Sequence, residues 1–192
     1  MCTQSESDQQ LVAQYLEGNE AVLTKLVERH KSKIYTAILM FVKDRYLAED
    51  IFQDTFIKVI DTLRSGKYKE EGKFLPWVMR IAHNLCIDYY RKVKRVPTIT
   101  NSEDFDIFEV LNFTDDNAEK SMIVKETKQK VRSLVEQLPE EQKEVVILRH
   151  YAGLSFKEIA QLTGVSINTA LGRMRYGLQN MRKVIAEKQI SI

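Results

Sequence analysis

The sequence predicts an all-α fold: two small helical domains joined by an acidic linker, the C-terminal one a helix-turn-helix. Three observations lead to this prediction. Apolar residues recur at helical spacing along most of the 192 residues, no segment alternates apolar and polar residues as a strand would, and the chain holds only 7 Gly and 3 Pro. A hydrophobic content of 44% and a charged content of 29% are typical of a globular protein.

The ends and the cysteines of the chain indicate its compartment. Cys2 and Cys86 lie far apart and form no CxxC pair, which fits a reducing environment. The N-terminal segment "MCTQSESDQQ" has no apolar signal core. The apolar run that begins at Ile34 is shorter than the about 20 residues that a membrane-spanning helix needs. We therefore expect a cytoplasmic protein with no direct membrane insertion.

Two helices are expected first, over residues 20–43 and 46–64, because both segments carry an apolar stripe at helical spacing. The polar side of the second helix gathers Glu49, Asp50, Gln53 and Asp54. Acidic side chains repel DNA, so this face favours a basic protein surface as its partner. The alternative is a solvated helix start, at which acidic residues meet the positive end of the helix dipole. The residues alone leave both interpretations open.

A charged loop over residues 65–73 precedes the third helix, which we expect over 76–94 because proline is tolerated in a first helical turn. This segment joins aromatic residues to a basic end, a combination that suits opened DNA, since bases stack on rings and cations hold phosphates. Trp77 can equally be an ordinary core aromatic. The candidate DNA-binding residues here are Lys73, Trp77, Asn84, Asp88, Arg91 and Lys92.

Residues 96–119 contain several Asp and Glu but no Lys or Arg, which indicates an acidic linker. Helical spacing resumes near Lys120 and runs to about Gln137, and "LPEE" at 138–141 begins the next helix. We therefore expect domains at 1–95 and 120–192 with the linker 96–119 between them.

The segment "GLSFKEIAQLTGVSINTALGR" predicts the helix-turn-helix. Gly164 stands where the chain must turn sharply, Ser166 can cap the following helix, and Ala170, Met174 and Leu178 are expected to form its buried face. The helix is rich in donors and cations that suit a major groove. The candidate residues are Ser166, Asn168, Thr169, Arg173, Arg175 and Tyr176. A helical hairpin that only packs is the alternative, and any single arginine is more readily a phosphate contact or a solvated charge than a base reader.

The sequence offers no pattern of catalytic chemistry. His30, His83 and His150 are scattered, and no HExxH motif, phosphate-binding glycine loop or nucleophile–base pair is present. We expect no metal, no cofactor, no small-molecule substrate and no enzymatic activity.

Three ordered blocks resemble a bacterial RNA polymerase sigma factor of the extracytoplasmic-function (ECF) group: "AEDIFQDTFIKV", "FLPWVMRIAHNLCIDYYRK" and "LPEEQKEVVILRHYAGLSFKEIAQLTGVSINTALGRM". The resemblance implies that Asp50, Gln53 and Asp54 contact the β′ clamp helices of core polymerase. It implies that the second block, with Asn84, Asp88 and Arg91, melts and reads the promoter −10 element, and that the loop 65–73 captures a flipped-out base. The third block would read the −35 element and meet the β-flap.

The resemblance also implies a function and a regulator. The chain would bind core polymerase and direct promoter-specific transcription initiation, the linker would thread toward the RNA exit path, and an anti-sigma factor would be a partner. Leu171 and Gly172 depart from the family, which often has Lys or Arg followed by Ser there. A stand-alone helix-turn-helix regulator, with tight operator binding in the absence of polymerase, is the alternative function.

Overall fold

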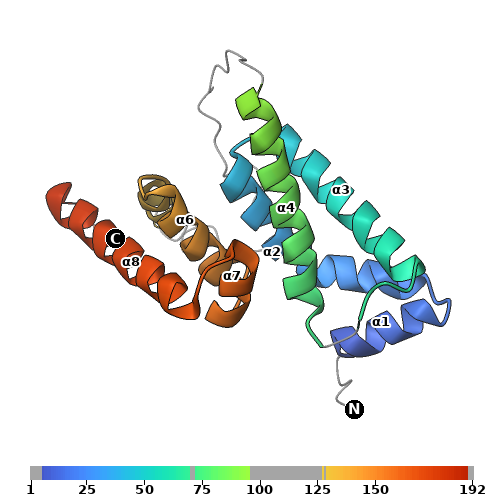
Figure 1. Ribbon diagram of the computed structural model, residues 1–192. Helices are drawn as coiled ribbons and strands as arrows, with labels where there is room; N and C mark the ends of the chain where they lie inside the picture. Colours follow the sequence, from blue (N-terminus) through green and yellow to red (C-terminus); the bar gives the residue numbers. More distant parts are fainter. Residues whose placement is uncertain (1–5, 70–71, 96–126, 128, 190–192) are drawn as a thin grey trace, which may run out of the picture. The chain divides into compact units, whose positions relative to one another are not determined.

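A computed structural model of the chain describes residues 6–69, 72–95, 127 and 129–189 (Figure 1). The chain divides into two compact units, Met1–Thr100 and Asn101–Ile192. Within the described ranges the regular structure is helical in both units and no residue is in a strand. The all-α fold class predicted from the sequence is therefore confirmed.

The first unit consists of four helices: α1 (Asp8–Leu16), α2 (Ala21–Val42), α3 (Arg45–Arg64) and α4 (Phe74–Arg95). Helix α2 contacts the other three, and α3 packs along α4 (Figure 1). The helices expected over 20–43 and 46–64 are confirmed within a residue or two. Helix α4 begins at Phe74 rather than at Pro76, because the first turn leaves its N–H groups unpaired and so accepts proline at its third position as well.

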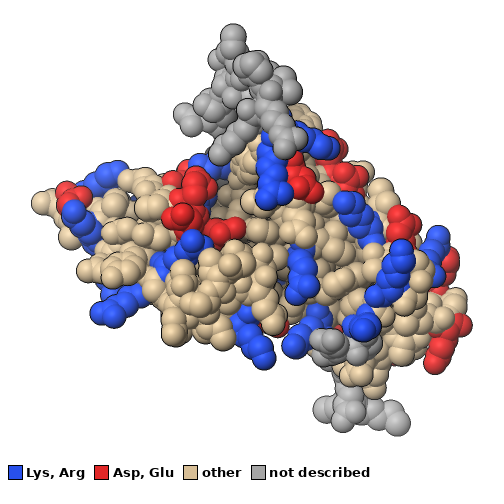
Figure 2. Space-filling view, in the orientation of Figure 1, with Lys and Arg blue, Asp and Glu red and all other residues tan. Residues whose placement is uncertain are grey.

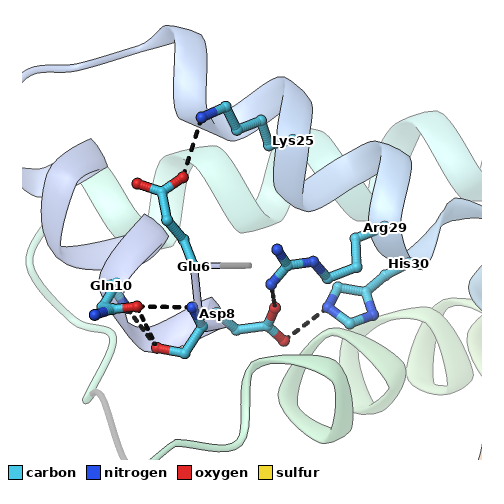
Figure 3. Close-up of polar contacts among 7 residues, drawn as sticks. Glu6, Asp8, Gln10, Lys25, Arg29 and His30 are labelled. Atoms are coloured by element: carbon cyan, nitrogen blue, oxygen red, sulfur yellow. Dashed lines mark hydrogen bonds and ion pairs between the residues drawn. The ribbon is translucent and has the colours of Figure 1, made fainter. Parts of the chain in front are cut away.

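Helix α1 was not anticipated by the apolar pattern, and polar contacts explain why this short segment folds. Ser7 and Gln10 form a capping box at its start. The carboxylate of Asp8 lies 2.7 Å from Arg29 Nη1 and 2.7 Å from His30 Nε2 on α2 (Figure 3). Ahead of the helix, Glu6 accepts hydrogen bonds from Gln14 and from Lys25 of α2, and these partners lower the pKa of the Glu6 carboxyl. These contacts fix α1 against α2.

The core of the first unit is formed by side chains of all four helices, such as Leu11, Leu26, Ile38, Val59 and Met79, each no more than 1% exposed. Cys86 of α4 belongs to this core, and its burial raises the pKa of the thiol to about 12. A thiol in this setting is almost wholly protonated at neutral pH and is a poor nucleophile.

We therefore expect a Cys2→Ser variant of the full chain to react with iodoacetamide at pH 8 more than about 1,000-fold more slowly than a free thiol does, the ratio of the two thiolate fractions. The rate should approach the free-thiol value once denaturant unfolds the first unit. Mass spectrometry of the alkylated protein measures both rates. Rapid labelling of Cys86 in the folded protein would show that α4 does not stay packed as described.

The second unit contains a helix over residues 129–136, then α6 (Glu140–Val146), a π-helical turn (Ile147–Tyr151), α7 (Phe156–Thr163) and α8 (Ile167–Glu187). Helix α6 follows Pro139 as its N-cap, which confirms that "LPEE" begins a helix. The start expected near Lys120 lies outside the described residues, as does the whole predicted linker over 96–119. The sequence did not predict the π-helical turn, in which the i→i+5 bonding admits one more residue per turn.

Candidate polymerase and DNA interfaces

Three of the four polar residues predicted to face a partner on α3 are exposed. Asp44 caps the helix by accepting a hydrogen bond from Leu47 N at 3.0 Å, and the apolar stripe of α3 is buried against the core. Asp50, Gln53 and Asp54 are exposed, and none of them makes an ion pair or a side-chain hydrogen bond with another residue that the structure describes. We call these three residues the α3 face. Its carboxylates are solvated and available to a partner.

Glu49, predicted as a fourth member of the group, behaves differently. It is half-buried, and its Oε1 lies 3.0 Å from Arg45 Nε one turn earlier. The same hydrogen bond raises the pKa of the Arg45 guanidinium. The structure therefore separates Glu49, which has a partner within the helix, from the α3 face.

The helix-dipole explanation for these acidic residues does not fit the observed helix. Helix α3 begins at Arg45 and has no acidic residue in its first turn. Asp50 and Asp54 stand further along, and the favourable effect of the dipole fades after the first turn. Their clustering is thus not explained by helix stability.

Sequence reasoning missed two apolar neighbours of the α3 face. Tyr46 is 78% exposed and Ile57 is 55% exposed, although both are large hydrophobic side chains. The spacing of residues 46, 50, 53 and 57 puts them on one side of the helix. That spacing was the available signal, because both apolar residues stand outside the buried stripe. The α3 face therefore combines charge with exposed apolar area, as protein-binding surfaces do.

Helix α4 carries a polar face opposite its buried side. Its buried residues include Phe74, Val78, Ala82 and Cys86. The predicted DNA-binding residues Lys73, Asn84, Asp88, Arg91 and Lys92 are all exposed. Asp88 and Arg91 form an exposed pair at 3.6 Å, which contributes little to stability. Arg80, also exposed and one turn before Asn84, is a further cation that the sequence analysis did not single out.

Trp77 is packed against other aromatic rings on one part and exposed on another. It is half-buried, and its ring centroid lies 4.3 Å from that of Tyr68 in the preceding loop and 5.8 Å from that of Phe74. Phe74 in turn lies 5.9 Å from His30 of α2. One part of Trp77 therefore anchors the loop to α4, while the other part reaches the surface beside the basic residues. The interpretation of Trp77 as a core aromatic is therefore compatible with its interpretation as a DNA-binding residue.

The helix-turn-helix of the second unit has the local geometry that its sequence indicates. Ser155 and Glu158 form a capping box at the start of α7, and Gly164 ends that helix in the left-handed region at φ 69°. A residue with a Cβ is strained there, so glycine is strongly favoured. Ser166 then caps α8 by accepting a hydrogen bond from Thr169 N at 3.0 Å, and its hydroxyl lies 2.9 Å from that of Thr169.

The predicted buried face of α8 is partly wrong. Ala170 is fully buried and Met174 is half-buried, but Leu178 is 39% exposed. Gly177 takes the inner position, where an added Cβ would lie 3.4 Å from Val146 Cγ2 of α6. The reason is the helical period of 3.6 residues: strict four-residue steps drift around the helix, so by Leu178 the side chain has left the interface.

The outer side of α8 is basic. Asn168, Thr169, Arg175 and Tyr176 are exposed, and Arg173 is half-buried. Glu187 is the only acidic residue of α8, and it pairs with Lys183 at 3.7 Å. Arg175 and Arg182 form no ion pair with any residue in the described part of the chain. In the view of Figure 2, Lys and Arg side chains project from the surface over this helix.

The described residues contain no group of three or more His, Cys, Asp or Glu placed to hold a metal ion. None of their helices combines the length and the apolar character needed to cross a membrane.

Comparison with known proteins gives matches in both units. The family model for Sigma-70 region 2 matches residues 26–96, and that for Sigma-70, region 4 matches residues 128–175. The RNA polymerase sigma-H factor of Pseudomonas aeruginosa is 32% identical over 178 residues, which cover 91% of each chain. The ECF RNA polymerase sigma-E factor of Escherichia coli is 30% identical over 175 residues, covering 88% of each chain.

Solved structures share the fold. CnrH, determined in complex with the cytosolic domain of CnrY, superposes with a TM-score of 0.67 at 22% identity, covering 95% of this chain and 99% of that one. The sigma factor RpoE of Bartonella quintana, determined with the anti-sigma factor NepR, gives a TM-score of 0.63 at 16% identity, covering 85% of this chain and 96% of its own.

Proposed function

The chain belongs to the ECF group of RNA polymerase sigma factors, which direct polymerase to promoters, and from this premise we propose how its two units divide that work. The α3 face docks on core polymerase, the exposed side of α4 holds the opened −10 element, and α8 reads the −35 element. One observation carries the proposal: acidic groups with no ion-pair partner among the described residues gather on α3, while cations with no such partner gather on α8.

Docking would use the α3 face against a basic surface, which the family resemblance places on the β′ clamp helices. Asp50 and Asp54 are free of partners within the described chain, so no internal ion pair must break before they bind. Tyr46 and Ile57 would add apolar contact at the two ends of the face. The second unit would contact the β-flap.

Promoter opening would fall to α4 and the loop before it. Asn84, Asp88 and Arg91 share an exposed side, with Lys73, Arg80 and Lys92 as nearby cations for the phosphates. Flipping a base out of the duplex costs a few kcal/mol. Stacking of an unpaired base on an aromatic ring returns about 1–3 kcal/mol, and the exposed part of Trp77 can supply such a ring. Binding in this way offsets the cost of strand separation.

Recognition of the −35 element would follow helix-turn-helix geometry, in which the first turns of the second helix meet base edges. Asn168 has the amide that pairs well with adenine, and Arg175 and Arg182 suit phosphates. Ser166 and Thr169 act mainly in capping α8, since the Ser166 hydroxyl accepts a hydrogen bond from Thr169 N and the two hydroxyls bond to each other. Their contribution to DNA binding would be positional.

Membership of the sigma factor family also leads to proposals about the chemistry, the location and the regulation of the chain. The chain would form and break no bond, because RNA synthesis belongs to the polymerase, and it would act in the cytoplasm where that enzyme works. An anti-sigma factor would hold it inactive, by analogy with RpoE of Bartonella quintana, whose structure was solved in complex with the anti-sigma factor NepR. A free stand-alone regulator is not favoured, because such a protein has no use for a separate acidic docking face.

Run-off transcription tests the proposed function. Core polymerase with the purified full chain should transcribe a subset of promoters from a genomic fragment library that core polymerase alone does not use. The chain should also retain the β and β′ subunits when it is purified from its own host. If no fragment gives a promoter-specific transcript, the proposed roles of the two units in transcription initiation are wrong.

A further inference from the structure

Gly172 lies in the middle of the outer side of α8. Residues 168, 172, 175 and 176 are spaced so that they share one side of the helix, and Asn168, Arg175 and Tyr176 on that side are exposed. Gly172 therefore stands within the surface proposed to enter the major groove.

The chain itself gives no reason for a glycine at this position. Gly172 does not have the positive φ of Gly164, and no described atom outside its own helix backbone lies within 4 Å of a Cβ built there. Gly177, one turn and a residue later, shows the contrast, because its added Cβ would meet α6. A glycine inside a helix costs about 0.5–1 kcal/mol relative to alanine. The folded chain thus carries a cost at Gly172 that no described contact offsets.

The neighbouring side chains are apolar and exposed. Leu171 is 43% exposed and Ile167, one turn before it, is 46% exposed, although both are large apolar side chains. In the major groove a base pair offers an apolar group only where thymine carries its C5-methyl group. An exposed leucine next to a glycine therefore fits a major groove that contains thymine, because the leucine can contact the methyl group and the glycine lets the helix backbone come close to the DNA.

We propose that Leu171 and Gly172 determine specificity together: Gly172 lets the backbone of α8 come close to the groove, and Leu171 packs against a thymine methyl group of the −35 element. This inference rests on the proposed role of α8 as the −35 reader. It assigns part of the −35 specificity to an apolar side chain, whereas a Lys or Arg at position 171 would bring a charge to the groove.

A cycle that pairs a DNA change with a protein change tests the contact of Leu171. The probe is a promoter duplex selected by the holoenzyme from a library randomised across the −35 element, with each thymine then replaced singly by deoxyuridine, which removes only the methyl group. At one position the replacement should weaken binding of the wild-type holoenzyme about fourfold, the value for one buried methyl group. With Leu171→Ala the same replacement should have almost no effect.

Leu178→Ala is the matched control, since Leu178 is an exposed leucine of the same helix two turns further on. It should keep the full thymine effect. If the replacement has the same effect with Leu171→Ala as with the wild type, or no effect at any thymine, the contact of Leu171 does not exist.

Gly172→Ala tests the close approach through two readouts of opposite sign. Alanine should raise the thermal midpoint of the full chain by about 2 °C, because it favours the helix. It should nevertheless weaken binding of the holoenzyme to the selected promoter about tenfold, because the new methyl group meets the DNA. A purely structural glycine would lower the midpoint instead, and an unchanged promoter affinity would overturn the proposal.

Failure of the Leu171 and Gly172 contact can be distinguished from failure of the proposed role of α8. If Arg175→Ala weakens promoter binding while the Leu171 and Gly172 tests are negative, α8 still reads DNA and only the uncharged contact is wrong. If Arg175→Ala is also without effect, α8 is not the reader and the proposed function itself fails.

Discussion

The double variant Asp50→Ala and Gln53→Ala is expected to lose more than about 100-fold in affinity for core polymerase while keeping the thermal stability of the wild type. Removing one partner of a buried, hydrogen-bonded charge pair at an interface costs about 2–5 kcal/mol, and the amide adds a further hydrogen bond. In the free chain both side chains are exposed and make no hydrogen bond or ion pair with the described residues, so folding loses nothing. Fluorescence anisotropy with labelled chain and circular dichroism measure the two quantities.

The matched control is Glu28→Ala, which removes an exposed carboxylate of the same unit that pairs only with Lys31 within α2. This variant should bind polymerase as the wild type does. Equal losses in both variants would indicate that net charge matters and that the α3 face has no specific role. Unchanged binding by the double variant would place the polymerase contact elsewhere on the chain.

Much of the fold could be predicted because apolar residues recur with the helical period along the long helices. Helices α2 and α3 bury mainly apolar residues at helical spacing, so their existence and bounds follow from that spacing. The turn at Gly164 and the cap at Ser166 could also be predicted, since few residue types fit a left-handed turn or an N-cap.

The remaining features have other causes. Helix α1 is short, and its attachment depends on the polar contacts of Glu6 and Asp8 with α2, which periodicity does not report. The pairing of Glu49 with Arg45, which sets it apart from Asp50, depends on side-chain rotamers within α3. Leu178 was placed in the buried face because four-residue steps were used for a helix with a period of 3.6 residues, and Gly177 takes the inner position instead.

Arg175→Ala combined with Arg182→Ala is expected to weaken promoter binding by the holoenzyme roughly 100-fold at physiological salt. A hydrogen bond from an ionised donor contributes about 1.5 kcal/mol or more, and both guanidinium groups are exposed without ion-pair partners among the described residues. Each phosphate contact also releases counterions, so the slope of log affinity against log salt should become less steep by about 1.8. Binding titrations at several salt concentrations measure both effects, with Lys33→Ala on the first unit as the control for a lost exposed cation.

The salt slope also distinguishes the two roles that an arginine can have on α8. A phosphate contact carries no sequence information, so its loss should weaken all promoter variants alike and should reduce the slope. A base-reading arginine would instead relax discrimination at one position by about 1–3 kcal/mol. The absence of partners around Arg175 and Arg182, and their placement beyond the first turn of α8, favour phosphates for both. An unchanged slope together with altered preference at a single base pair would reverse that assignment and make α8 read its element through charge rather than through Leu171.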